Sequence, residues 1–117
     1  MEKKEWMRKI NAACKKAGTY QPQFKYVIET LAQIMEDRDK VHDQYVADGA
    51  KPTIIHTNKA KERNVVKNPM LVMEMELNSQ ALAYWRDLGL TPAGLKKLND
   101  DAMKPKKQSS LADLLNG

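Results

Sequence analysis

Apolar residues recur at helical spacing in four stretches of the chain. In the first stretch, over residues 2–16, they form one stripe, and Gly18 follows as a stop signal. We therefore predict a first helix with one buried face and cations on its other faces. The stripe consists of Trp6, Ile10, Ala13, Cys14 and Ala17.

The second stretch is the longest. It begins at Pro22, which suits the first turn of a helix, and ends at Gly49, which gives about 26 residues and roughly 40 Å. A helix of this length in so small a chain favours packing against neighbours outside the chain. Its broad apolar face comprises Phe24, Val27, Ile28, Leu31, Met35, His42 and Tyr45, with Ile34 and Val41 at the edges.

Helical periodicity fails between Gly49 and Asn68. Two short runs rich in β-branched residues, 53–55 and 65–66, flank a polar stretch over residues 58–64. The two runs either pair as a small hairpin or lie extended along the body, and the sequence does not decide between these alternatives. About twenty residues without a helix are long for a compact domain, which indicates a functional or mobile connector.

Two further helices follow the connector. Asn68 and Pro69 supply a cap and a first turn for a helix that Gly89 ends. Thr91 and Pro92 repeat this start signal for a short helix over residues 93–99. The apolar positions of the longer helix include Leu71, Met75, Leu77, Leu82, Trp85 and Leu88, and those of the shorter one Leu95 and Leu98.

The remaining residues differ in character from the helical part. Residues 100–110 are polar and resemble a linker, and a short amphipathic segment follows. We expect a helical domain over residues 1–99 and a linker with a docking segment over residues 100–117. The segment either docks a partner or folds back onto its own body. Its apolar residues are Leu111, Leu114 and Leu115.

Length and composition place the chain among soluble one-domain proteins, and its four helical stretches place it in the all-α class. It has 117 residues, of which 42% are hydrophobic and 30% charged. No run approaches the roughly 18 apolar residues of a membrane span, and residues 1–9 are charged where a signal peptide is apolar. We expect a cytoplasmic protein. Cys14 is the single cysteine, which excludes an intrachain disulfide and a cysteine cluster for zinc.

Positive charge is concentrated in three segments, namely the first helix, the connector and residues 89–108, which contain five Lys against two Asp. Residues 1–17 contain six Lys or Arg against two Glu, and residues 49–69 contain five against one, within a net charge of +5. Such asymmetry favours a polyanionic partner, although a solvated surface accounts for the charge nearly as well. The candidate DNA-binding residues are Lys3, Lys4, Arg8, Lys9, Lys15, Lys16, Lys59, Lys61, Arg63 and Lys67.

No catalytic motif of a common type occurs in the sequence. There is no Walker phosphate loop, no nucleophile elbow and no His-Glu-x-x-His helix. The acidic cluster Glu36, Asp37, Asp39 and Asp43 has the types that two metal ions require, but Lys40 stands four residues after Glu36, as in a surface ion pair. We interpret the cluster as surface or intersubunit salt bridges. His42 and His56 lack a third ligand, and we expect no metal, no cofactor and no enzymatic activity.

Two motifs carry a family resemblance. The run Lys67-Asn68-Pro69-Met70, about twenty helical residues, and then Leu88-Gly89-Leu90-Thr91-Pro92 closely resembles the small terminase subunits of tailed phages that cut at cohesive ends. The long helix between Gln21-Pro22-Gln23-Phe24 and Asp48-Gly49 also resembles the family's layout, and the resemblance covers about residues 5–99. After Thr91-Pro92, relatives carry small polar residues and an arginine, whereas this chain has Ala93, Gly94, Leu95, Lys96 and Lys97. Lysine keeps the charge but not the bidentate fork, so no phosphate clamp is carried over.

The resemblance implies a homo-oligomeric ring that binds double-stranded viral concatemer DNA in the host cytoplasm and recruits the large terminase subunit. The large subunit carries the ATPase and nuclease. Two other hypotheses remain: a helix-turn-helix transcriptional regulator that binds DNA as a dimer, and a helical adaptor that docks a partner through its tail. We expect the long helices to pack against copies of the chain through Phe24, Ile28, Leu31, Met35, Tyr45, Leu71, Met75, Leu82 and Trp85.

Overall fold

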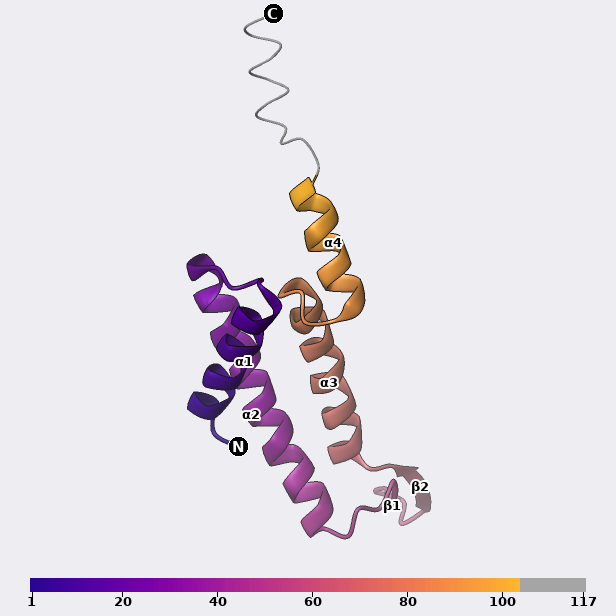
Figure 1. Ribbon diagram of the computed structural model, residues 1–117. Coiled ribbons are helices and arrows are strands. Elements are labelled where there is room, and N and C mark those ends of the chain that lie inside the picture. Colours follow the sequence, from indigo (N-terminus) through magenta and orange to yellow (C-terminus); the bar gives the residue numbers. More distant parts are fainter. Residues whose placement is uncertain (104–117) are drawn as a thin grey trace, which may run out of the picture.

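The chain folds into helices with one small β-hairpin, so the predicted mainly α-helical class is confirmed (Figure 1). The computed structural model describes residues 1–103, and the predicted docking leucines Leu111, Leu114 and Leu115 lie outside the described residues. The elements are α1 (Lys3–Ala17), a 3₁₀ turn (Pro22–Phe24), α2 (Lys25–Ala47), β1 (Thr53–Thr57), β2 (Arg63–Lys67), α3 (Pro69–Asp87) and α4 (Pro92–Met103).

Helix α2 is the central element and packs against both α1 and α3. Figure 1 shows α2 and α3 side by side as a long helical hairpin, with α1 along the first half of α2. The core lies where these helices meet, and Leu31 and Ala32 of α2 are fully buried there. The other buried apolar residues are Ile10, Cys14, Ile28, Met35, Ala81 and Leu88.

The ends of the helices follow local signals in the sequence. Gly18, with φ 75°, ends α1, and its N–H donates to the Cys14 and Lys15 carbonyls as in a left-handed helix cap. Pro22 opens a 3₁₀ turn, so the second helix begins as a tighter turn and becomes α-helical at Lys25. The predicted starts and stops of the longer helices are therefore confirmed to within a few residues.

The joint between α3 and α4 is fixed by Thr91 and two glycines. Gly89 has φ 71°, and Thr91 Oγ1 accepts a 3.0 Å hydrogen bond from the Gly94 N–H, which caps α4. An added Cβ at Gly94 would overlap the Arg86 carbonyl oxygen, so only glycine lets α4 cross the end of α3 this closely. Helix α4 continues to Met103, beyond the expected end at residue 99, because no helix-breaking residue occurs before Pro105.

The connector forms an antiparallel β-hairpin, which decides between the two alternatives left open by the sequence. Strand β1 pairs with β2 in the register Thr53 to Lys67 and Thr57 to Arg63. The hairpin lies at the end of the α2–α3 pair opposite α4, and all ten strand residues are exposed (Figure 1). It is held by its own ladder and by its junction with α3, and no helix of residues 1–103 covers its faces. Within residues 1–103, every helix is too short or too polar to cross a membrane.

Candidate nucleic-acid interface

The outer face of α1 carries a stripe of cations. Lys4, Arg8 and Lys15 are exposed and line one shallow groove together with Met7, Asn11 and Ala12. The Lys15 Nζ lies 4.9 Å from the centroid of the Tyr20 ring, and this cation–π contact holds the ammonium group over the ring. Lys9 and Lys16, seven residues apart and both exposed, lie on a neighbouring stripe of the same helix.

Lys3 differs from the other cations of α1, because it faces α2. Its Nζ lies 3.2 Å from Glu29 Oε1, and its backbone N–H donates a 2.6 Å hydrogen bond to Glu36 Oε2. The Lys3 side chain is 33% exposed, so it is held within the helix pair. Of the six predicted cations in α1, Lys3 is thus the one already engaged by a carboxylate of the described chain.

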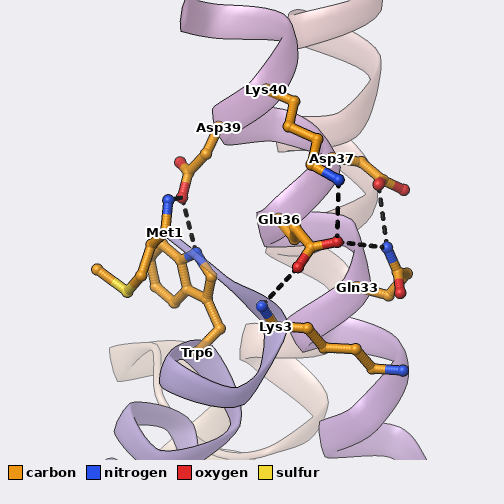
Figure 2. A network of polar contacts seen from close by, with 8 residues as sticks. All are labelled: Met1, Lys3, Trp6, Gln33, Glu36, Asp37, Asp39 and Lys40. Atoms are coloured by element: carbon orange, nitrogen blue, oxygen red, sulfur yellow. Dashed lines mark hydrogen bonds and ion pairs between the residues drawn. The ribbon is translucent and has the colours of Figure 1, made fainter.

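Two carboxylates of α2 dock the start of α1 (Figure 2). Helix α1 has no side-chain cap of its own, and Glu36 from α2 accepts its first N–H instead. Asp39 Oδ2 accepts a 2.7 Å hydrogen bond from the Trp6 indole and lies 3.3 Å from the amino group of Met1. These carboxylates therefore place negative charge at the positive end of the α1 dipole.

Both docking carboxylates have lowered pKa values. The hydrogen bond from the Lys3 backbone N–H, followed by the one from Lys40, lowers the pKa of Glu36 below its ordinary value of 4.5. Burial raises the pKa of Asp39, but the Trp6 indole, the Met1 amino group and Arg38 together lower it below 3.8. Both side chains are therefore held as carboxylates, and their charge supports the junction between α1 and α2.

Two members of the acidic cluster, Glu36 and Asp39, thus hold α1 against α2. Lys40 Nζ lies 3.3 Å from Glu36 Oε1, so the predicted ion pair is confirmed, and Asp37 accepts a 3.0 Å hydrogen bond from Gln33. Within residues 1–103, no three His, Cys, Asp or Glu side chains are grouped so as to hold a metal ion. What the sequence did not reveal is the partner of Glu36 and Asp39, because α1 lies more than thirty residues away in the chain.

Trp6 connects α1 to α3 as well as to α2. Its ring lies 6.5 Å from the Trp85 ring in an edge-to-face arrangement, with 61° between the planes. On α2, the His42 Nδ1 lies 2.9 Å from Glu74 Oε1 of α3, whereas His56 lies on β1 opposite Asn64. The two histidines therefore occupy different parts of the structure and share no site.

The hairpin carries the second group of cations. Lys59 and Lys61 lie in its turn, and Arg63 and Lys67 lie four residues apart on β2, so their side chains point to the same face. All four are exposed, and none forms an ion pair within residues 1–103. The structure thus brings the four predicted cations of the connector together on one small projecting element.

Two asparagines fix the shape of this hairpin. Asn58 Oδ1 accepts hydrogen bonds from the Ala60 and Glu62 N–H groups at 3.0 and 2.9 Å, which closes the turn, and Lys61 adopts φ 63°. Asn68 is 7% exposed and makes the root: its Nδ2 donates to the Lys51 carbonyl, its N–H donates to the Pro52 carbonyl, and its Oδ1 caps α3 at Met70. One side chain therefore holds the hairpin to the first turn of α3.

The predicted oligomerisation residues fall into two groups. Ile28, Leu31 and Met35 are buried by the chain's own helices, so they belong to the protomer core and leave no surface for a second copy. Their burial follows from the packing of α1 and α3 on either side of α2, which their spacing alone does not specify. Phe24 and Trp85 pack partly against the same core, and Tyr45 is half-buried.

One side of α3 carries an apolar stripe that is exposed in its middle, at Met75, Asn78 and Leu82, and half-buried at its two ends. Leu71, Met75, Asn78, Leu82 and Trp85 follow one another at spacings of four and three residues, the pattern of a helix–helix seam. The Met75 side chain is 63% exposed and that of Leu82 is 49% exposed. This stripe, hereafter the α3 stripe, is the part of the predicted oligomerisation set that remains accessible.

The described chain is therefore a small helical protein that displays two cationic surfaces, one on a docked helix and one on a projecting hairpin. The family model for the phage terminase small subunit matches residues 3–104. The chain belongs to the family of phage terminase small subunits. Comparisons with curated proteins and with solved structures gave no match.

The motifs that carried the family resemblance are structural joints. Asn68 caps α3 and holds the hairpin root, and Pro69 forms the first turn of α3. Leu88 is buried, Gly89 takes the left-handed conformation, and Thr91 caps α4. These residues therefore define how the elements are joined, and the cations that we assign to DNA lie outside them.

Proposed function

We propose that this terminase small subunit is a non-catalytic component that binds double-stranded viral DNA as a homo-oligomer in the host cytoplasm and recruits the large subunit. The observation that supports this role is the display of cations on two exposed surfaces of a family member. The α1 surface comprises Lys4, Arg8, Lys9, Lys15 and Lys16, and the hairpin surface comprises Lys59, Lys61, Arg63 and Lys67.

Binding by these cations would gain free energy mainly from the release of counterions at phosphates. Such binding tolerates many sequences and weakens steeply as salt increases. One chain offers few contacts, but several copies on one duplex raise the effective concentration of each further contact. A homo-oligomer therefore turns weak surfaces into a stable nucleoprotein complex.

The α3 stripe is the surface that we assign to contact between copies. Its spacing fits the seam of two packed helices, and its central Asn78 fits a polar position that sets the register of such a seam. Exposed Met75 and Leu82 leave apolar area in water that a second copy would cover. Ring closure and the number of subunits belong to this proposal, which rests on the family resemblance and on the stripe.

Recruitment of the large subunit is assigned to the end of the chain. Leu111, Leu114 and Leu115 follow a polar stretch, which is the pattern of a short docking peptide. Deletion of residues 109–117 should abolish stimulation of the large subunit's ATPase and leave DNA binding intact. Unchanged stimulation would contradict this assignment.

Salt-dependent DNA binding tests the central claim. Fluorescence anisotropy with a mixed-sequence duplex should give an affinity that falls strongly with salt. The variant K4A/R8A/K15A should bind more weakly, and its slope of log affinity against log salt concentration should be smaller by up to about three. The triple variant K25A/K96A/K97A removes the same charge from other exposed positions and is the matched control. Equal loss in both variants would indicate a general charge effect.

Native mass spectrometry tests the oligomer. Met75→Lys should lower the mass to that of smaller species, because it places a charge in the seam, whereas Met73→Lys on another face of α3 should leave the mass unchanged. A wild-type monomer at micromolar concentration would overturn the homo-oligomer. A dimer that protects a palindrome would support a transcriptional regulator instead.

A further inference from the structure

The two faces of the β-hairpin differ in charge. Side chains directly opposite in an antiparallel pair share one face, and successive residues alternate between faces. The cationic face consists of the pairs Thr57–Arg63, Ile55–Val65 and Thr53–Lys67. The neutral face consists of Ile54–Val66 and His56–Asn64. Both cations of β2 therefore flank one apolar pair, on the same side of the ribbon.

The cationic face is also the more open of the two. Ile55 is 59% and Val65 73% exposed, whereas Ile54 is 37% and Val66 36% exposed. An isolated two-stranded hairpin is marginally stable in water, and apolar side chains at such exposure add little to it. The openness of the Ile55–Val65 pair is therefore better explained by contact with a partner than by packing within the chain.

The hairpin keeps its shape without that partner. Asn58 closes the turn, and Asn68 holds the root to α3 through three hydrogen bonds. A segment that is already ordered loses little conformational entropy on binding. The hairpin thus presents its cationic face from an ordered ribbon, which lies at the end of the long helical pair (Figure 1).

The dimensions and chemistry of this face fit the major groove of DNA. Two strands lie about 4.8 Å apart, and Arg63 and Lys67 stand about 14 Å apart along β2 at 3.4 Å per residue. The major groove, about 12 Å wide, admits a two-stranded ribbon, and its base edges include the thymine methyl group and the guanine acceptors. The methyl-bearing side chains of Ile55 and Val65 suit the thymine methyl group, and Arg63 suits the guanine acceptors.

We propose, on the basis of the proposed function, that the cationic face of the hairpin enters the major groove of duplex DNA. The Ile55–Val65 pair contacts base edges there, and thymine methyl groups in particular, while Arg63 and Lys67 bind guanine edges or phosphates on either side. The α1 surface contacts phosphates outside the groove. The hairpin would thus give this subunit a means to distinguish base composition that α1 lacks.

Matched substitutions on the two faces test this inference. I55T/V65T and I54T/V66T change the same residue types in the same way, and threonine keeps the β-branched shape. On a mixed-sequence duplex, I55T/V65T should weaken binding about tenfold and I54T/V66T less than about twofold. Circular dichroism and native mass should match the wild type for both variants.

A second measurement addresses the thymine methyl groups directly. A duplex with deoxyuridine in place of thymidine lacks only these methyl groups. It should bind wild-type protein more weakly than the ordinary duplex, and I55T/V65T should show a smaller difference between the two duplexes, because each threonine keeps only one methyl group. Binding of wild type that ignores the replacement would overturn the contact with thymine.

The other outcomes separate the hairpin from the proposed function. If wild type binds no DNA at low salt, the proposed function falls, and this inference falls with it. If wild type binds in a salt-dependent manner but both face variants bind equally well, the hairpin does not enter the groove and the proposed function stands. If I55T/V65T instead lowers the oligomer mass, a second copy covers this face and the groove contact is overturned.

Discussion

The two sequence regions that carry the cationic surfaces, residues 1–17 and 49–69, have the same net charge, but the structure holds them in place by different contacts. Helix α1 displays its cations on the back of an element whose other side is buried at Ile10 and Cys14 and docked by Glu36 and Asp39. The hairpin has no buried strand residue and is held by its ladder and two asparagines. Substitutions on the outer hairpin therefore report on binding, whereas inner substitutions in α1 also change stability.

The largest difference between the two regions should appear in stability. Leu31→Ala removes a fully buried side chain where α1 and α3 meet α2, and we expect a loss of about 2–5 kcal/mol in the free energy of unfolding, measured by urea denaturation. Ile55→Ala on the hairpin should change it by less than about 0.5 kcal/mol. Similar losses in both variants would mean that the hairpin is packed in solution.

The root of the hairpin should behave as a part of the body. Asn68→Ala removes the cap of α3 and the hydrogen bond that Asn68 Nδ2 donates to the Lys51 carbonyl, so we expect a loss of about 1–2 kcal/mol in the free energy of unfolding. Hydrogen exchange should show faster exchange in β1 and β2, while the amides of α1 keep their relative protection. Asn58→Ala loosens only the turn and is the control for a local effect; equal exchange in both variants would contradict the role of Asn68.

The indole contact of α1 should contribute less. Trp6→Phe keeps an aromatic ring near Trp85 but removes the hydrogen bond to Asp39, and we expect a loss of about 1–2 kcal/mol by thermal or urea unfolding. The double variant Trp6→Phe with Asp39→Asn should lose less free energy of unfolding than the two single variants lose together, because both single variants remove the same hydrogen bond. An additive double variant would show that the two side chains act independently.

Acid should weaken the α1 junction and leave the hairpin unaffected. Because the pKa of Glu36 is lowered in the folded chain, its contribution is fully present above the ordinary value of 4.5 and is lost as the pH falls through the folded pKa. The melting temperature of wild type should therefore fall between about pH 5 and about pH 3. Glu36→Gln keeps an acceptor for the Lys3 N–H but has no charge to titrate, so its melting temperature should fall less over this pH range. Equal falls in the variant and in wild type would show that Glu36 does not cause the acid sensitivity.

The smallest effect should come from the cations themselves. Lys9→Ala on α1 and Lys61→Ala in the hairpin turn each remove an exposed charge, and both should change stability by less than about 0.5 kcal/mol. Each should still weaken DNA binding and reduce its salt slope by about one. Lys3→Ala should differ, because it breaks the pair with Glu29 but removes no cation of the α1 surface, and it should leave the DNA affinity nearly unchanged.

Local signals in the sequence gave correct expectations wherever a single turn of chain decides the outcome. Gly18 ends α1, Asn68 and Pro69 begin α3, and Thr91 and Pro92 begin α4, because caps and fixed backbone angles act within a few residues. The loss of helical periodicity between Gly49 and Asn68 correctly predicted a segment that is not helical. It did not choose between a hairpin and an extended strand, because pairing depends on residues some ten positions apart.

The sequence by itself determined the four helices, most of their boundaries, the basic segments and the family. Only the tertiary structure decided that Lys3 is held by Glu29, that Ile28, Leu31 and Met35 line the protomer core, and that Arg63 and Lys67 share one face of a ribbon. Helix spacing shows that a face is apolar but not which neighbour covers it. That choice depends on which helices meet, and contacts between distant segments carry no signature in a single local pattern.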